Sequence, residues 1–216
     1  VENIKLEYTG VFYERFINGF WVLAEGLIYP MYRDALCKAP ERYAEKYIMS
    51  IDYGTQNAFA GILWGLYDGV WIAVDCYYYS GRDKGIQKTD DEYGKDLEMF
   101  FEKNVPADYP KIKAIIDPSA ASFIALLRKS KHYKPIQADN DVLNGIRETA
   151  TAMQKGKIKI VETLTPIIKE FEGYVWDDST AEDRPVKVND HAMDSMRYFV
   201  KTMHIAKPKR KYSATW

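Results

Sequence analysis

The sequence predicts an α/β domain with a central mixed β-sheet, an antiparallel three-strand meander plus parallel strands, flanked by helices. Three apolar runs follow one another between residues 47 and 79. The last two are joined by Asp68 and Gly69, a pair that favours a tight β-hairpin. Further along, short apolar runs alternate with segments of helical periodicity, which is typical of parallel strands joined by helices. The 216 residues, 47% of them hydrophobic, can bury one medium-sized core.

The expected strands and helices follow from hydrophobic periodicity and from the residues that end or cap them. Strands are expected at 47–52, 58–67, 70–79, 112–116 and 134–138, with a brief exposed strand at 157–160. Helices are expected at 90–104, 120–131, 141–154 and 164–171 and from residue 190 onward, with a polar loop at 81–85 and a hairpin at 174–188. Pro118 ends the 112–116 strand because proline cannot donate to a ladder, and Asn140 or Asp141 is the expected N-cap of the following helix.

The two ends of the chain are expected to lie outside the domain. Residues 1–45 are rich in aromatics but show no sustained period, so we expect an N-terminal arm that packs on the domain. Residues 46–206 form the domain itself, and 207–216 form a basic tail. Cys37 and Cys76 are the only cysteines, too few for a disulfide framework, and free thiols are expected.

Three aspartates lie at strand ends or near a helix start, where catalytic residues are often found. Asp52 ends the first strand, Asp117 closes the 112–116 strand, and Asp194 lies in the first turns of the helix that begins at Asp190. This layout is the one that RNase H-like nucleases use to hold two divalent metal ions. His191 lies three residues before Asp194, on the same helix face.

Each residue also has an ordinary structural interpretation. Asp52 alone could make a turn hydrogen bond, and Asp117 before proline is a common turn opener. His191 could bond locally at the helix start. Asp190 suits an N-cap better than a metal ligand, and Lys187 could meet a phosphate or stay solvated.

Several motifs occur together in one order. They are Ile51-Asp52-Tyr53-Gly54, Ile116-Asp117-Pro118-Ser119, the run from Asp139 to Ile146, the helix start from Asp190 to Asp194, and the opening segments 12–22 and 24–30. On these motifs, nearly the whole chain resembles the nuclease domain of the large terminase subunit of tailed bacteriophages. Residues 1–45 then resemble the segment that joins the packaging ATPase to the nuclease.

The resemblance implies an RNase H-like fold and a metal-dependent endonuclease. Such an enzyme cuts double-stranded concatemeric viral DNA during genome packaging, with little sequence specificity, by two-metal phosphodiester hydrolysis with Mg²⁺ or Mn²⁺. Asp52 would bridge both ions, Asp117 would bind one and Asp194 the other, and His191 would be a ligand or a proton shuttle. Asparagine at any of the three aspartates would then abolish cutting and is expected to leave the fold intact.

The implied partners are double-stranded DNA, the ATPase domain of the same full-length polypeptide, the small terminase subunit and the portal protein. The implied location is the host cell cytoplasm, and no apolar run approaches the roughly 20 residues needed to cross a membrane. A net charge of −1 argues against a general electrostatic grip on DNA, so either basic residues cluster on one face or another domain holds the DNA. No G-x-x-x-x-G-K-[ST] motif occurs in the chain.

Two other functions compete. Residues 52–55, Asp-Tyr-Gly-Thr, also resemble the phosphate-binding turn of sugar kinases and actin-like ATPases, but these need a second, similar half with another such turn, which the chain lacks. A catalytically silent DNA-binding module would have no reason to hold three aspartates together. The acidic tip of the 174–188 hairpin is either a mobile gate that screens the site or an ordinary solvated turn.

Overall fold

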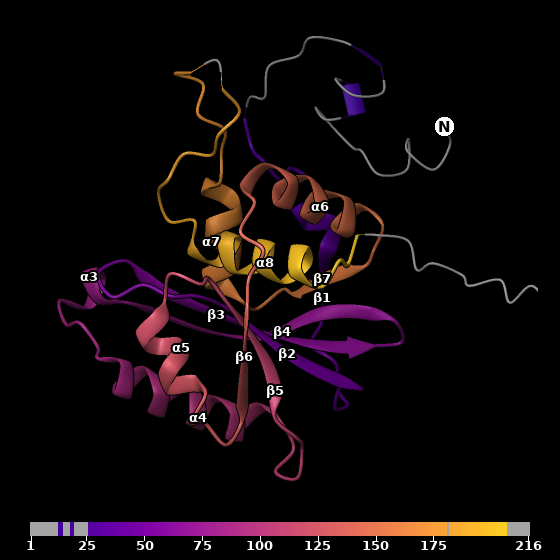
Figure 1. Cartoon of the computed structure of the whole chain (residues 1–216). Coiled ribbons are helices and arrows are strands. Elements are labelled where there is room, and N and C mark those ends of the chain that lie inside the picture. The colour runs from indigo at the N-terminus through magenta and orange to yellow at the C-terminus, as the bar shows by residue number, and fades with distance from the viewer. Residues whose placement is uncertain (1–12, 15–17, 20–25, 181, 207–216) are drawn as a thin grey trace, which may run out of the picture.

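The computed structural model describes residues 13–14, 18–19, 26–180 and 182–206, and shows a seven-stranded sheet with helices on both faces (Figure 1). The strand order is β1-β7-β4-β3-β2-β5-β6. The strands are β1 Leu36–Cys37, β2 Lys46–Asp52, β3 Ala58–Tyr67, β4 Val70–Ser80, β5 Ile112–Ile116, β6 Tyr133–Gln137 and β7 Ile158–Val161.

The centre of the sheet is the expected meander. β2, β3 and β4 pair antiparallel, with Asp52 opposite Ala60 at the end of the β2 pairing. Asp68 and Gly69 both have positive φ, 49° and 82°, as a two-residue turn of this hand requires. β5 is parallel to β2, β6 to β5, and β7 to β4. The predicted mixed sheet is therefore confirmed.

Two apolar cores cover the two faces of the sheet. The helices are η1 Tyr32–Ala35, α3 Gly81–Lys84, α4 Asp90–Asn104, α5 Ala121–Leu127, α6 Val142–Gln154, α7 Thr165–Gly173 and α8 His191–Thr202. α6, α7 and α8 lie on one face, and α4 and α5 on the other (Figure 1). The alternation along β2 sets the division, because Ile48 faces the α8 side and Met49 the α4 side.

The structure differs from the sequence expectations in four elements. The 157–160 strand is not exposed, since β7 pairs in parallel with both β4 and β1 and is mostly buried. The predicted arm, residues 1–45, was expected to lack regular structure, but it contains the 3-10 helix η1 and strand β1. The loop at 81–85 forms one helical turn, and the 120–131 helix stops at Leu127.

The N-terminal segment reaches the core because its aromatics pack there. Ile28, Tyr29 and Tyr32 are buried, and Tyr32 stacks on Phe171 of α7 with ring centroids 5.0 Å apart. Burying such side chains outweighs the absence of a local period. The part of the predicted arm before residue 26 lies largely outside the described residues, as does the 207–216 tail, and the domain limits at 45 and 206 stay predictions.

A buried polar cluster seats α8 on β2. Ser195 Oγ donates to the Ser50 carbonyl at 2.9 Å and lies 3.0 Å from Ser50 Oγ, which accepts from Trp64 Nε1 at 2.9 Å. Trp64 stacks on Phe199, with centroids 4.2 Å apart. Because all four side chains are fully buried, these contacts hold α8 against β2 and β3.

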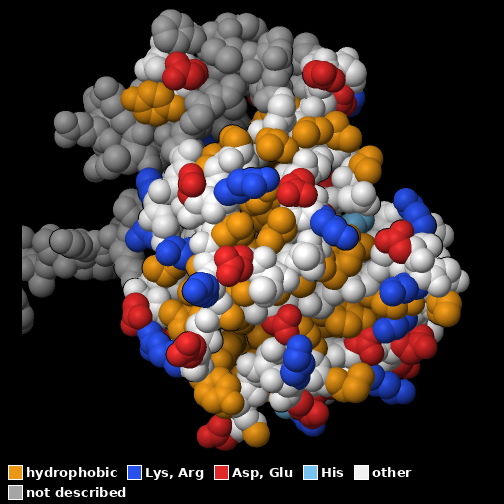
Figure 2. Space-filling model, turned by 180° about the vertical axis from the view of Figure 1, so that it is seen from behind, with side chains coloured by type: hydrophobic (Ala, Val, Ile, Leu, Met, Phe, Trp, Pro, Cys, Tyr) orange, Lys and Arg blue, Asp and Glu red, His pale blue; other side chains and the backbone are white. Residues whose placement is uncertain are grey.

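The surface shows no single-sign field on the side turned away in Figure 1. Lys and Arg side chains there are interspersed with Asp and Glu (Figure 2). That distribution suits the net charge of −1 and does not point to a DNA-binding patch on this side. Within the described ranges, every helix is too short or too polar to cross a membrane.

Candidate metal centre

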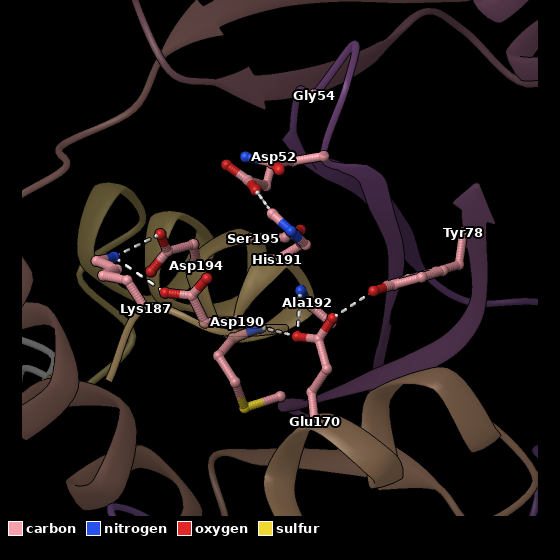
Figure 3. A network of polar contacts seen from close by, with 12 residues as sticks. Asp52, Gly54, Tyr78, Glu170, Lys187, Asp190, His191, Ala192, Asp194 and Ser195 are labelled. Carbon is pink, nitrogen blue, oxygen red and sulfur yellow. Dashed lines mark hydrogen bonds and ion pairs between the residues drawn. The ribbon is translucent and has the colours of Figure 1, made fainter. Parts of the chain in front are cut away.

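Asp52 and His191 meet at the junction of β2 and α8. Asp52 is the last residue of β2 and His191 the first of α8. His191 Nδ1 lies 2.9 Å from Asp52 Oδ2, and both side chains are 17% exposed (Figure 3). Burial raises the pKa of the Asp52 carboxyl, with Asp194 adding to the effect. Although burial opposes it, the bond to Asp52 raises the pKa of His191.

Asp194 lies one turn further along α8, between two cations. Arg197 Nη2 donates to its Oδ1 at 2.9 Å, and Lys187 Nζ lies 3.3 Å from its Oδ2. Lys187 also lies 3.0 Å from Asp190 Oδ2, so one ammonium joins both carboxylates (Figure 3). Although burial opposes it, these two carboxylates raise the pKa of Lys187.

Asp117 follows β5, the strand beside β2. The β2–β5 register ends with Ile51 opposite Ile116, so Asp52 and Asp117 stand at equivalent positions on neighbouring parallel strands, about 5 Å apart in the backbone. Asp117 accepts from Ser119 N at 2.8 Å and from Asn140 Nδ2 at 2.9 Å. Partial burial works against them, yet these bonds lower the pKa of Asp117.

A polar pocket of about 370 Å³ opens at this junction. Its lining residues are Asp52, Tyr53, Gly54, Asn57, Arg82, Lys187, Val188, Asn189, Asp190, His191 and Asp194. Three of the four predicted site residues thus share one pocket, while Asp117 is not among its lining residues. Across the ranges that the structure describes, no three His, Cys, Asp or Glu side chains already converge as a metal-binding group.

The donor types nevertheless fit Mg²⁺ or Mn²⁺, which prefer carboxylate oxygens. The described arrangement gives each predicted ligand another partner: His191 for Asp52, two cations for Asp194, and Ser119 with Asn140 for Asp117. Carboxylates this close repel one another unless cations or hydrogen-bond donors separate them. The four residues therefore remain a predicted metal site, with oxygen and nitrogen donors near the ends of β2 and β5 and the start of α8.

Comparison with known proteins decides the family. The Terminase RNaseH-like domain model matches residues 51–202, from the end of β2 through α8. The chain belongs to this family. The resemblance and the RNase H-like fold expected from the sequence are thereby confirmed.

Solved structures agree with this assignment. The large terminase of a thermophilic bacteriophage, in complex with ADP, is 48% identical, with a TM-score of 0.86 over 94% of this chain and 51% of that one. The P22 large terminase nuclease domain is 19% identical, with a TM-score of 0.65 over 84% and 94% of the two chains. The large terminase nuclease of thermophilic phage G20c with bound magnesium is 16% identical, with a TM-score of 0.57 over 82% and 97%.

These likenesses differ in what they support. The P22 and G20c structures, at such low identity, support the fold alone. This terminase-family chain spans about half the length of the ADP-bound large terminase. No curated protein matches it.

The N-terminus of α8 in this terminase-family domain is capped from another helix. Asp190 occupies the N-cap position, as expected, but its side chain makes no capping hydrogen bond and pairs with Lys187 instead. Glu170 of α7 takes that role: its Oε2 accepts from Ala192 N at 2.6 Å and Met193 N at 3.2 Å (Figure 3). Its Oε1 accepts from Tyr78 at 2.8 Å.

Sequence reasoning missed both Glu170 and Arg197. Glu170 reads as one polar position in an amphipathic helix, and Arg197 as an ordinary helix cation. The signal that could have drawn notice is weak. Glu170 has Ile167 three residues before it and Tyr174 four residues after it, which predicts burial, and a buried charge requires partners. Arg197 has charged neighbours one turn away, Asp194 and Lys201, so its helix position gives no such signal.

Glu170 carries a pH-dependent prediction. Burial raises its pKa to about 7 from an ordinary 4.5, despite three hydrogen bonds. A raised folded-state pKa contributes stability that is fully present below pH 4.5 and is lost as pH rises through about 7. Relative to Glu170→Gln, the free energy of unfolding of the wild type should fall by on the order of 3 kcal/mol between pH 4.5 and 8.

Urea unfolding of both proteins at several pH values measures this difference. The Gln variant is the control because it cannot titrate. Parallel curves for the two proteins would mean that Glu170 keeps an ordinary pKa.

In the residues that the structure describes, the predicted 174–188 hairpin contains an isolated β-bridge rather than two full strands. Trp176 bridges Pro185, and Asp177 N donates to the Arg184 carbonyl at 2.9 Å. At the tip, Asp177 accepts from Ser179 and pairs with Arg184 at 2.8 Å, bonds that lower the pKa of Asp177. The hairpin delivers Lys187 to the pocket, and whether its tip acts as a gate stays a hypothesis.

Proposed function

We propose that this chain is the nuclease domain of a large terminase, a metal-dependent endonuclease that cuts double-stranded concatemeric viral DNA during packaging. The observation that carries the proposal is the pocket at the junction of β2 and α8. There Asp52, His191 and Asp194 come together at the end of β2 in a terminase RNase H-like domain.

The proposed ligands are Asp52, Asp117, Asp194 and His191, with Asp52 shared between two Mg²⁺ or Mn²⁺ ions. When bound, such ions would stabilise charge on the entering and leaving oxygens of the phosphodiester. The bound magnesium of the G20c nuclease supports a divalent ion in this fold. Asp117 would join the set from the neighbouring strand.

Other roles concern the proton and the phosphate. If His191 acts as a proton shuttle rather than a ligand, its ring, with Nδ1 2.9 Å from Asp52 Oδ2, would hold or release a proton beside the site. Arg82 and Lys187 line the same pocket and present positive charge where a DNA phosphate would approach. Cutting with little sequence specificity is part of the proposal.

The partners follow from the proposal. The substrate is double-stranded DNA in the host cell cytoplasm, and an ATPase domain of the same full-length polypeptide would hold and move it. The small terminase subunit and the portal protein would complete the packaging machine. Since the chain spans about half of the ADP-bound large terminase, these assignments concern the longer protein.

The test is to incubate the purified chain with supercoiled plasmid and Mn²⁺ or Mg²⁺, and to follow open-circular and linear products on a gel. We expect both products. DNA retention in a mobility-shift assay without either product would instead favour the catalytically silent DNA-binding module. ATP hydrolysis without DNA cutting would favour the actin-like or sugar-kinase interpretation of Asp52-Tyr53-Gly54-Thr55.

A further inference from the structure

Arg197 is the largest charged side chain in the interior of the domain, and the proposed chemistry gives it no part. Its side chain is 2% exposed, on the α8 face that meets α6. Burying a guanidinium costs several kcal/mol unless every donor finds a partner. Where these donors go is therefore informative.

Each of the three guanidinium nitrogens donates a hydrogen bond. Nη2 and Nε donate to Asp194 Oδ1 at 2.9 and 3.3 Å, and Nη1 donates to the backbone carbonyl of Asn140 at 2.8 Å. The side chain of the same Asn140 donates to Asp117 Oδ2 at 2.9 Å. Hydrogen bonds thus connect Asp194 to Arg197, Arg197 to the Asn140 backbone, and the Asn140 side chain to Asp117.

α6 is shaped to accept the arginine. A Cβ at Gly145 would lie 2.4 Å from Arg197 Cγ and 2.7 Å from Cδ, closer than real contacts allow. Glycine in a helix interior costs about 1 kcal/mol relative to alanine. Here it leaves a groove for the Arg197 stem. Asn140 and Gly145 both belong to the run 139–146, one of the motifs on which the chain resembles terminase nuclease domains.

We propose that Arg197 is a positioning residue that holds Asp194 directly, and Asp117 through Asn140, in one connected arrangement, with Gly145 providing the space it needs. The two aspartates stand on different elements, α8 and the end of β5. Because both belong to the proposed metal site, this inference rests on the proposed function.

Two variants test the arrangement without changing the net charge. Arg197→Lys keeps the positive charge, but a single ammonium group cannot reproduce the planar guanidinium that donates to Asp194 and to Asn140 at once. Gly145→Ala keeps the arginine at position 197, but its new Cβ displaces the Cγ and Cδ atoms of that side chain. Arg42→Lys is the control for the first, since Arg42 pairs with Asp68 at the opposite end of β3. Gly94→Ala is the control for the second, because its Cβ would meet Leu126, outside the site.

The first readout needs no metal. The side-chain carboxyl ¹³C resonances of Asp194 and Asp117 are recorded at one pH in the metal-free protein. We expect both resonances to move in Arg197→Lys and in Gly145→Ala, and neither to move in the controls. An Asp117 resonance that stays in place in both variants would overturn the connection through Asn140.

The second readout is Mn²⁺ affinity by calorimetry. We expect roughly 10- to 100-fold weaker binding in either variant, the usual loss when a partner of a metal ligand is removed. The losses should not add in the double variant, since both act through one side chain. A fall in melting temperature with Mn²⁺ affinity within about twofold of wild type would make Arg197 merely structural.

The two proposals fail differently. If the wild type does not bind Mn²⁺ at all, the proposed metal site is wrong, while the carboxyl resonances still decide whether Arg197 links the two aspartates. If the wild type binds Mn²⁺ and both variants match it, the positioning role alone is wrong.

Discussion

Plasmid cutting should stop when EDTA is added, and should return with excess Mn²⁺. The reason is the charge at the pocket: Asp52 and Asp194 must come near a phosphodiester, which repels them unless cations intervene. Metal ions supply several kcal/mol of charge stabilisation to such reactions. At about 1.4 kcal/mol per factor of ten, their removal should slow cutting on the order of 10³-fold or more.

The control separates loss of metal from loss of fold. EDTA saturated beforehand with Mn²⁺ should leave cutting intact. The protein in EDTA should still unfold in a cooperative thermal transition, because two apolar cores hold the domain together without metal. Undiminished cutting in chelator would exclude a metal-dependent mechanism.

Asp52→Asn should reduce cutting to background, again on the order of 10³-fold, because it removes the proposed shared ligand at the end of β2. Its stability should stay level or rise. Burial raises the pKa of Asp52, which means that the folded protein disfavours the charged form. An asparagine oxygen can still accept from His191. Asp117→Asn should lose cutting as well.

Asp194→Asn should behave differently in stability, which revises the sequence expectation that all three variants leave the fold intact. Arg197 is 2% exposed and pairs with Asp194. Removing one partner of a buried ion pair leaves an uncompensated charge and costs on the order of 3 kcal/mol. Urea unfolding of the three Asn variants, beside plasmid assays, checks both effects. Residual cutting in Asp52→Asn, or equal stability in all three, would contradict this account.

The sequence by itself determined the framework on which the site stands. Strand periodicity, the Asp68-Gly69 turn and Pro118 place Asp52 and Asp117 each at the end of a strand. Helical periodicity after Asp190 places His191 and Asp194 on one face. These signals are local: each depends on residues a few positions apart, so they can be read without knowing the fold.

Tertiary structure alone decided what each carboxylate meets. Asp52 and His191 lie 139 positions apart in the chain, and Arg197 and Asn140 lie 57 apart. Glu170, not Asp190, caps α8, and β1 joins the sheet although its two residues carry no strand signal. No periodicity predicts such contacts, because they depend on how two elements pack and on which buried charge must find a partner once water is excluded.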